Sequence, residues 1–167
     1  MGLLIEKLAD KRKVIVFHHV AFPLPQHENI VPAFGQALGD AIAIFAKCSL
    51  AVCTDSAFLH VAAAFNMPTV ALCGPTDGVV VTKHHSNAHV VSLGHAFKCM
   101  PCWRNEDIPC QLTGGRESAC MAAINEGEIV ALVIRLLQQA DVADSLTHLA
   151  SPHHLPSQVS VSIDTRR

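Results

Sequence analysis

Short apolar runs alternate with amphipathic stretches along most of this chain. The runs that predict buried strands are 14–17, 50–54, 69–73, 79–81 and 89–93. Helices are predicted before the first run and over residues 35–48, 57–65 and 125–139, where apolar residues favour one face. Buried parallel strands are continuously apolar and are joined by helices. The pattern therefore predicts an α/β fold, a Rossmann-like parallel sheet with helices on both faces.

Two segments interrupt this pattern. Residues 21–32 contain three prolines, which predicts an irregular connection. Residues 144–167 lose the apolar period and gain Ser, Pro, His and Thr, which predicts a disordered tail. We therefore expect one folded domain over residues 1–143, which includes a cysteine-rich loop at 99–120, and then the tail.

Composition narrows the class of function. The 167 residues are 50% hydrophobic and 16% charged, with a net charge of −2, so no basic surface is expected to attract nucleic acid. No apolar stretch approaches the roughly 18–20 residues of a membrane span. The first residues lack the apolar core of a signal peptide. These features predict a soluble cytoplasmic protein with no nucleic-acid partner and no transmembrane segment.

Polar residues follow two predicted strands at the point where each strand ends. After the first, Asp55 and Ser56 can cap a helix that begins at about Ala57, and His60 lies one turn further on the same face. The free N–H groups of a helix N-terminus carry partial positive charge, so they suit an anion such as a diphosphate. The alternative is an ordinary cap followed by a structural histidine.

After the second strand comes the turn Gly74-Pro75-Thr76-Asp77. Gly74 permits close backbone approach, and Thr76 offers a hydroxyl and an N–H group. If the two strands are parallel, both turns lie at the carboxyl edge of the sheet, where open α/β sheets bind ligands. The alternative is a turn that only connects two elements.

The order of these residues resembles a known family. Residues 55–64, DSAFLHVAAA, followed by Pro68 and the turn GPTD at 74–77, are similar to the donor-binding segment of glycosyltransferase family 9, the ADP-heptose:lipopolysaccharide heptosyltransferases and their relatives. The family pattern is approximately D-S/T-G-x-x-H-x-A-A-A, then an apolar strand and G-P-T-D. The resemblance extends more loosely over residues 35–139.

The resemblance implies the C-terminal domain of a GT-B glycosyltransferase. It implies inverting transfer of a heptose-like sugar from an ADP-linked donor, with no metal or other cofactor required for transfer. The residues that would bind the diphosphate and sugar of the donor are Asp55, Ser56, Ala57, His60, Gly74, Thr76 and Asp77.

Two features depart from the family pattern. Ala57 and Phe58 stand where the family commonly has Gly and often Pro. The family's N-terminal acceptor-binding domain, with its catalytic carboxylate, has no counterpart in this sequence. We therefore expect the donor-binding half of such an enzyme, which contributes no catalytic residue of its own and needs an acceptor domain for sugar transfer.

Four cysteines form a second candidate site, with the spacing Cys99-x2-Cys102-x7-Cys110-x9-Cys120. Four thiolates can hold a tetrahedral Zn²⁺ or iron ion, and such a closed site is structural. One branch of the resembling family has a four-cysteine iron site. The alternative is a set of reduced cysteines that pack a loop, since cytosolic thiols seldom form disulfides.

Two other functions remain open at this point. One is a non-catalytic, metal-stapled α/β module that acts in protein interaction. The other is a different nucleotide-binding α/β protein that shares only the anion site at the helix end.

Overall fold

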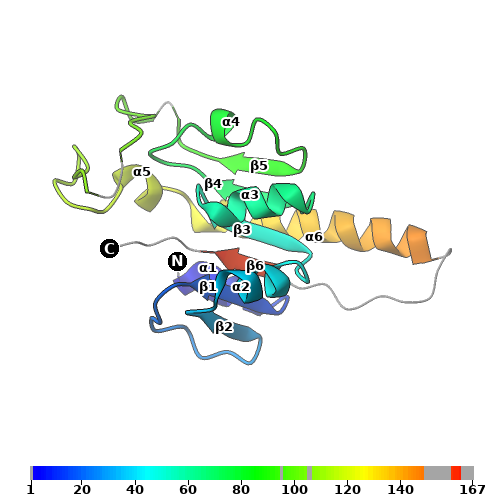
Figure 1. The fold of residues 1–167 in the computed structure, drawn as a ribbon. Coiled ribbons are helices and arrows are strands. Elements are labelled where there is room, and N and C mark those ends of the chain that lie inside the picture. The colour runs from blue at the N-terminus through cyan, green and yellow to red at the C-terminus, as the bar shows by residue number, and fades with distance from the viewer. Residues whose placement is uncertain (1, 95, 105–106, 149–158, 163–167) are drawn as a thin grey trace.

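The structure is a computed structural model that describes residues 2–94, 96–104, 107–148 and 159–162. Within these residues, six parallel strands form one sheet in the order β2-β1-β6-β3-β4-β5 (Figure 1). The strands are β1 (Val14–His18), β2 (Ile30–Phe34), β3 (Leu50–Thr54), β4 (Thr69–Leu72), β5 (Ala88–Val91) and β6 (Val159–Ser162). The predicted Rossmann-like α/β fold is confirmed.

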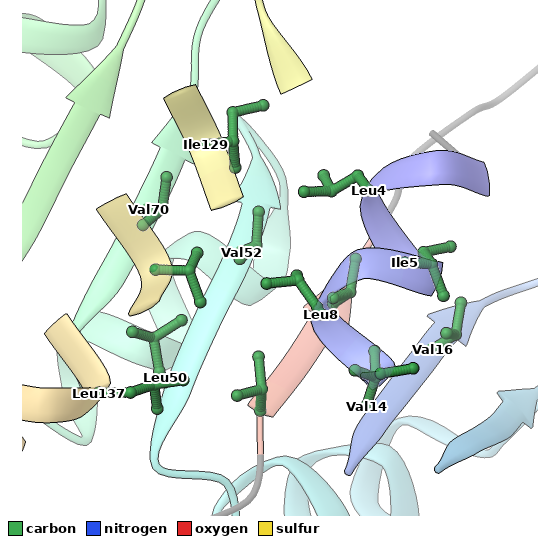
Figure 2. Packing of buried hydrophobic residues seen from close by; sticks show 14 of the residues in the cluster. Leu4, Ile5, Leu8, Val14, Val16, Leu50, Val52, Val70, Ile129 and Leu137 are labelled. Carbon is green, nitrogen blue, oxygen red and sulfur yellow. The ribbon is translucent and has the colours of Figure 1, made fainter. Parts of the chain in front are cut away.

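Helices cover both faces of the sheet. On one face lie α1 (Gly2–Ala9) and α6 (Glu126–His148), which pack on alternate residues of the strands, such as Val14 and Val52. Figure 2 shows Leu4 and Leu8 of α1 and Leu137 of α6 within this cluster. Among the described residues, no helix is long and apolar enough to cross a membrane.

The opposite face carries α2 (Leu38–Phe45) and α3 (Ala57–Ala64). The other alternate residues of β1 pack there, and Phe17 contacts the rings of Phe45 and Phe58. Phe58, which departs from the family pattern, is therefore part of the core that holds α3 on the sheet. As predicted, α3 ends before Asn66, which has a positive φ of 51°.

The prediction of a strand at 79–81 is wrong. This segment forms a short helix, α4 (Gly78–Val81), because Asp77 caps it. The Asp77 carboxylate accepts the N–H groups of Val79 at 2.9 Å and Val80 at 3.3 Å. A capping residue outweighs the strand preference of three valines here.

The expected irregular connection at 21–32 is also wrong at its end, because β2 begins at Ile30 and contains Pro32. Pro32 lies opposite Val16 of β1, and β2 is an edge strand. A proline, which lacks an N–H group, is tolerated on an edge strand, where one side of the backbone has no partner strand.

The largest difference concerns the expected disordered tail at 144–167. The helix α6 continues to His148, and β6 lies between β1 and β3, parallel to both. Val159 and Val161 enter the core, and the Ser160 hydroxyl donates to the carbonyl of Leu50 at 3.2 Å. The prediction is therefore wrong for the helix end and for β6. Residues 149–158 and 163–167 lie outside the described residues.

Candidate functional site

The two predicted loops leave the same edge of the sheet. The strands β3 and β4 are parallel neighbours, and Thr54 at the end of β3 lies opposite Leu72 at the end of β4. The loop at 55–56 and the loop at 73–77 therefore both follow the carboxyl ends of their strands. This is the edge at which open α/β sheets bind ligands.

Two hydroxyl groups at the start of α3 lack a hydrogen-bond partner within the part of the chain that the structure describes. Ser56 is the N-cap residue and is extended, but its side chain makes no capping hydrogen bond. The oxygens of Ser56 and Thr54 are both buried, and neither has a hydrogen-bond partner among the described residues. Buried hydroxyls are normally paired, so this pair of oxygens marks the α3 N-terminus as a candidate ligand site. Ala57, the first residue of α3, is exposed beside them.

A buried thiol at the start of the 73–77 loop interacts electrostatically with residues of both loops. Cys73 follows β4 directly and is almost fully buried. Burial and, to a smaller extent, the carboxylates of Asp55 and Asp77 raise the pKa of Cys73 to about 11, although a hydrogen bond from the Thr76 side chain opposes this rise. Cys73 therefore lies within electrostatic range of both loops. The sequence predicted only a buried thiol at this position. Its place between the end of a strand and Gly74 could have indicated that it lies at the candidate site.

The structure gives Gly74 and Asp77 packing roles at this edge. A Cβ atom on Gly74 would lie 2.7 Å from Met121 and 2.9 Å from the thiol of Cys120. The groups that approach Gly74 closely are therefore side chains of α5 (Ala119–Ala122), whereas the sequence predicted that a ligand would approach this glycine. The carboxylate of Asp77 caps α4, which directs it toward backbone N–H groups.

The predicted anion contact His60 lies against a second histidine. The rings of His60 and His85 meet edge to face, with centroids 5.3 Å apart. His85 follows α4, and its buried Nδ1 has no hydrogen-bond partner among the residues that the structure describes. The pKa of His85 is lowered by burial and by His60 and His84. From the sequence, His84 and His85 could add positive charge near the diphosphate, but a solvated loop is the favoured interpretation, and no motif spacing connects His85 to His60.

The four predicted metal ligands line one pocket. Cys99, Cys102, Cys110 and Cys120 surround it together with Trp103 and other residues of the segment 99–120, called here the cysteine lobe. Cys120 interacts electrostatically with Cys102 and Cys110. Backbone N–H groups of Ala119, Leu112 and Thr113 lower the pKa of Cys110 to about 7, which favours its thiolate.

The donor chemistry of this pocket fits a soft metal ion, but the side chains are not gathered around one point. Among the described residues, no three His, Cys, Asp or Glu side chains are placed to hold a metal ion together. Binding of a metal by the cysteine lobe would therefore require its thiols to move closer to one another.

The cysteine lobe also touches the site edge. The backbone N–H group of Trp103 donates to the backbone carbonyl of Pro75 at 2.9 Å. Together with the contacts of Cys120 and Met121 on Gly74, this hydrogen bond places the cysteine lobe against the 73–77 loop.

Comparison with known proteins identifies the class to which this fold and site belong. The family model for Glycosyltransferase family 9 (heptosyltransferase) matches residues 26–112, just over half of the chain, and includes both loops. The chain therefore belongs to glycosyltransferase family 9.

A curated relative agrees with this assignment. Lipooligosaccharide heptosyltransferase 2 of Haemophilus influenzae is 46% identical to this chain over 74 residues, which are 44% of this chain and 21% of that protein. The match thus spans about a fifth of the relative's length. No solved structure matches the chain.

Proposed function

We propose that this chain is the donor-binding half of a family 9 glycosyltransferase. In this proposal it holds a nucleotide-diphosphate sugar at the carboxyl edge of the sheet. An acceptor-binding domain completes a GT-B enzyme that transfers a heptose-like sugar with inversion, in the cytoplasm, during lipopolysaccharide synthesis. Family membership and the similarity to a heptosyltransferase support this proposal.

The observation that carries the proposal is that the two loops leave the same edge of the sheet, beside two buried hydroxyls at the α3 N-terminus that have no hydrogen-bond partner among the described residues. The α3 N–H groups and the hydroxyls of Ser56 and Thr76 are donors suited to diphosphate oxygens. As the bond between the sugar and the diphosphate breaks, charge grows on the leaving diphosphate, and fixed donors stabilise it most at that point. The Asp55 carboxylate can accept hydrogen bonds from hydroxyl groups of the nucleotide-diphosphate sugar.

Calorimetric titration with ADP and with ADP-heptose tests this proposal. We expect both ligands to bind, and we expect Ser56→Ala to weaken both by about tenfold, the worth of a hydrogen bond to a charged group. The matched control is Ser86→Ala, because Ser86 is exposed and precedes β5 at the opposite edge of the sheet. Absence of binding heat for both ligands would count against the proposal.

A second candidate function is a metal-stapled interaction module. It is favoured by the four cysteines around one pocket and by the lowered pKa of Cys110. We propose that Cys99, Cys102, Cys110 and Cys120 are the ligands of a structural Zn²⁺ or iron ion. The ion would hold the cysteine lobe in one conformation, and the transfer reaction would not use it.

Elemental analysis of the purified chain tests the metal proposal. We expect about one equivalent of zinc or iron, lost in Cys102→Ser and kept in Cys48→Ala, whose thiol lies in the core beside α2. Metal affinity should fall as the pH drops, and more steeply below about pH 7, because protons then compete for the Cys110 thiolate as well as for the other ligands. Equal metal content in both variants would contradict the assignment. Metal without nucleotide binding would favour the interaction module.

A further inference from the structure

Trp103 is the only tryptophan in this chain, and its side chain is 52% exposed. Large aromatic side chains are usually buried, and an exposed one beside a candidate site suggests a binding role. The backbone of Trp103 is also unusual, with φ of +50°. A bulky residue rarely adopts this left-handed conformation, and such residues gather at ligand sites.

Backbone contacts fix Trp103 at the rim of the candidate donor site. Its N–H group donates to the carbonyl of Pro75 at 2.9 Å, and Pro75 directly precedes Thr76. The contacts of Cys120 and Met121 on Gly74 hold the other end of the cysteine lobe to the same loop. Trp103 is therefore anchored to the loop that the proposed function assigns to the diphosphate and sugar.

The neighbouring residue keeps the cysteine lobe folded around Trp103. The Arg104 guanidinium donates to the carbonyls of Ile108 at 2.8 Å and Arg116 at 2.7 Å. It also donates to the hydroxyl of Ser118, just before α5. Because Arg104 is bonded to both arms of the lobe and the backbone N–H group of Trp103 is bonded to Pro75, the backbone at residues 103 and 104 is held in place. A fixed backbone is what a preorganised binding surface needs.

The pocket that Trp103 lines is the one around which the four cysteines lie, and its exposed lining residues combine apolar and polar groups. Ile108 and Leu112 contribute exposed apolar surface, and Gln111 contributes an exposed amide that can donate and accept hydrogen bonds. A sugar ring would lie on this exposed part, and the proposed metal ion would lie among the thiols. Sugar rings carry hydroxyls around their rim and C–H groups on their faces. An aromatic face next to an amide therefore suits a sugar ring, in the same way that small-molecule sites pair apolar walls with a few polar groups.

We propose that Trp103 is a platform on which the sugar ring of the nucleotide-diphosphate-sugar donor stacks. This inference rests on the proposed function, because the 73–77 loop must hold the diphosphate for the sugar to reach Trp103. It assigns Trp103 to recognition of the sugar and leaves the nucleotide to the α3 end of the site.

The chain offers a direct measurement, because it has one Trp and no Tyr. Indole fluorescence of the full chain therefore reports on Trp103 alone. We expect ADP-heptose to change the emission of the wild-type chain at saturation, and we expect ADP to leave it unchanged. An equal change with ADP would mean that the nucleobase stacks on Trp103, and it would overturn the assignment to the sugar.

Calorimetry of variants separates this inference from the proposed function. We expect Trp103→Ala to weaken ADP-heptose by about tenfold, a typical worth of stacking on an aromatic ring, and to leave ADP affinity unchanged. Trp103→Phe should recover most of the loss. The matched control is Phe65→Ala, another exposed aromatic, which follows α3 at the opposite edge and should change neither affinity.

The remaining outcomes each decide the matter. If Trp103→Ala weakens ADP and ADP-heptose equally, Trp103 supports the loop and the inference fails. If the wild-type chain binds both ligands and Trp103→Ala binds them equally well, the inference fails and the proposed function stands. If the wild-type chain binds neither ligand, both fail. Far-ultraviolet circular dichroism of each variant checks that it is folded.

Discussion

The two halves of the sheet differ in how the chain builds them. In one half, β3, β4 and β5 lie side by side in the order of the sequence, and this half carries both loops of the candidate site. In the other half, β1 is followed outward by β2, but its inner neighbour is β6, from the last residues that the structure describes. Figure 1 shows β6 between the two halves.

A doubly wound sheet usually has the strand order 3-2-1-4-5-6, in which the first strand of the chain is central. The order here is the same, except that the last strand occupies the place of the first. The comparison shows that a central place in the sheet can be filled by a four-residue segment that lies far from both of its partner strands in the sequence. What β6 needs is two valines for the core and a backbone that pairs on both sides.

A charge in β6 should have the largest effect of the variants considered. Val161 is 1% exposed and lies opposite Val16 on one side and Val52 on the other. We expect Val161→Asp to lower the free energy of unfolding by about 3–5 kcal/mol, the cost of an unpaired buried charge, which is enough to unfold a marginal domain. Urea unfolding followed by circular dichroism measures this loss.

The matched control is Val31→Asp on β2, the edge strand that pairs with β1. Val31 is 37% exposed on β2, so the new carboxylate stays in contact with water. We expect this variant to lose less than about 1 kcal/mol. Equal unfolding midpoints for the two variants would show that β6 is not a buried central strand.

The contrast between the halves also explains what the sequence could predict. The run Leu50–Thr54 is apolar up to its last residue, and the helix that follows it is apolar except at His60, so local pattern alone predicted β3 and α3. The segment Val159–Ser162 alternates apolar and small polar residues within a polar stretch. This alternation is typical of a strand, but it covers only four residues and the prediction passed over it. The strand forms because β1 and β3 both offer it backbone partners, and pairing over such a sequence distance cannot be predicted from the local pattern.

The next variant tests where the site-bearing half meets the cysteine lobe. A Cβ atom on Gly74 would press on Met121 and Cys120. We expect Gly74→Ala to lower the free energy of unfolding by about 1–3 kcal/mol, the usual cost of overpacking. Adding Met121→Ala should recover part of the loss, because it removes the side chain that lies 2.7 Å from the new atom.

Gly39→Ala is the control for this glycine substitution. Gly39 lies in α2, and a Cβ atom there meets nothing within 4 Å. Alanine is favoured over glycine in a helix, so we expect a gain of about 0.5–1 kcal/mol. If Gly74→Ala proves as stable as Gly39→Ala, the cysteine lobe does not pack on the 73–77 loop.

The site was predictable only in part, for a physical reason. Motif order placed Ser56 and Thr76 at the ends of two strands, and parallel pairing brings those ends to one edge. The contacts of Cys73, His85 and Trp103 join segments that no motif spacing connects. The sequence also left open which hydrogen-bond partner each polar group has, so the capping role of Asp77 is visible only in the structure.

The smallest effect separates two helix N-caps within the site-bearing half. The Asp77 carboxylate accepts two N–H groups of α4, whereas the Ser56 hydroxyl makes no capping bond to α3. We expect Asp77→Ala to lower the free energy of unfolding by about 1 kcal/mol, as for a typical cap, and Ser56→Ala by less than about 0.5 kcal/mol. Urea unfolding of both variants, without ligand, measures the difference. If Ser56→Ala costs as much as Asp77→Ala, its hydroxyl serves α3 as a cap, and the argument that it is held for a ligand is lost.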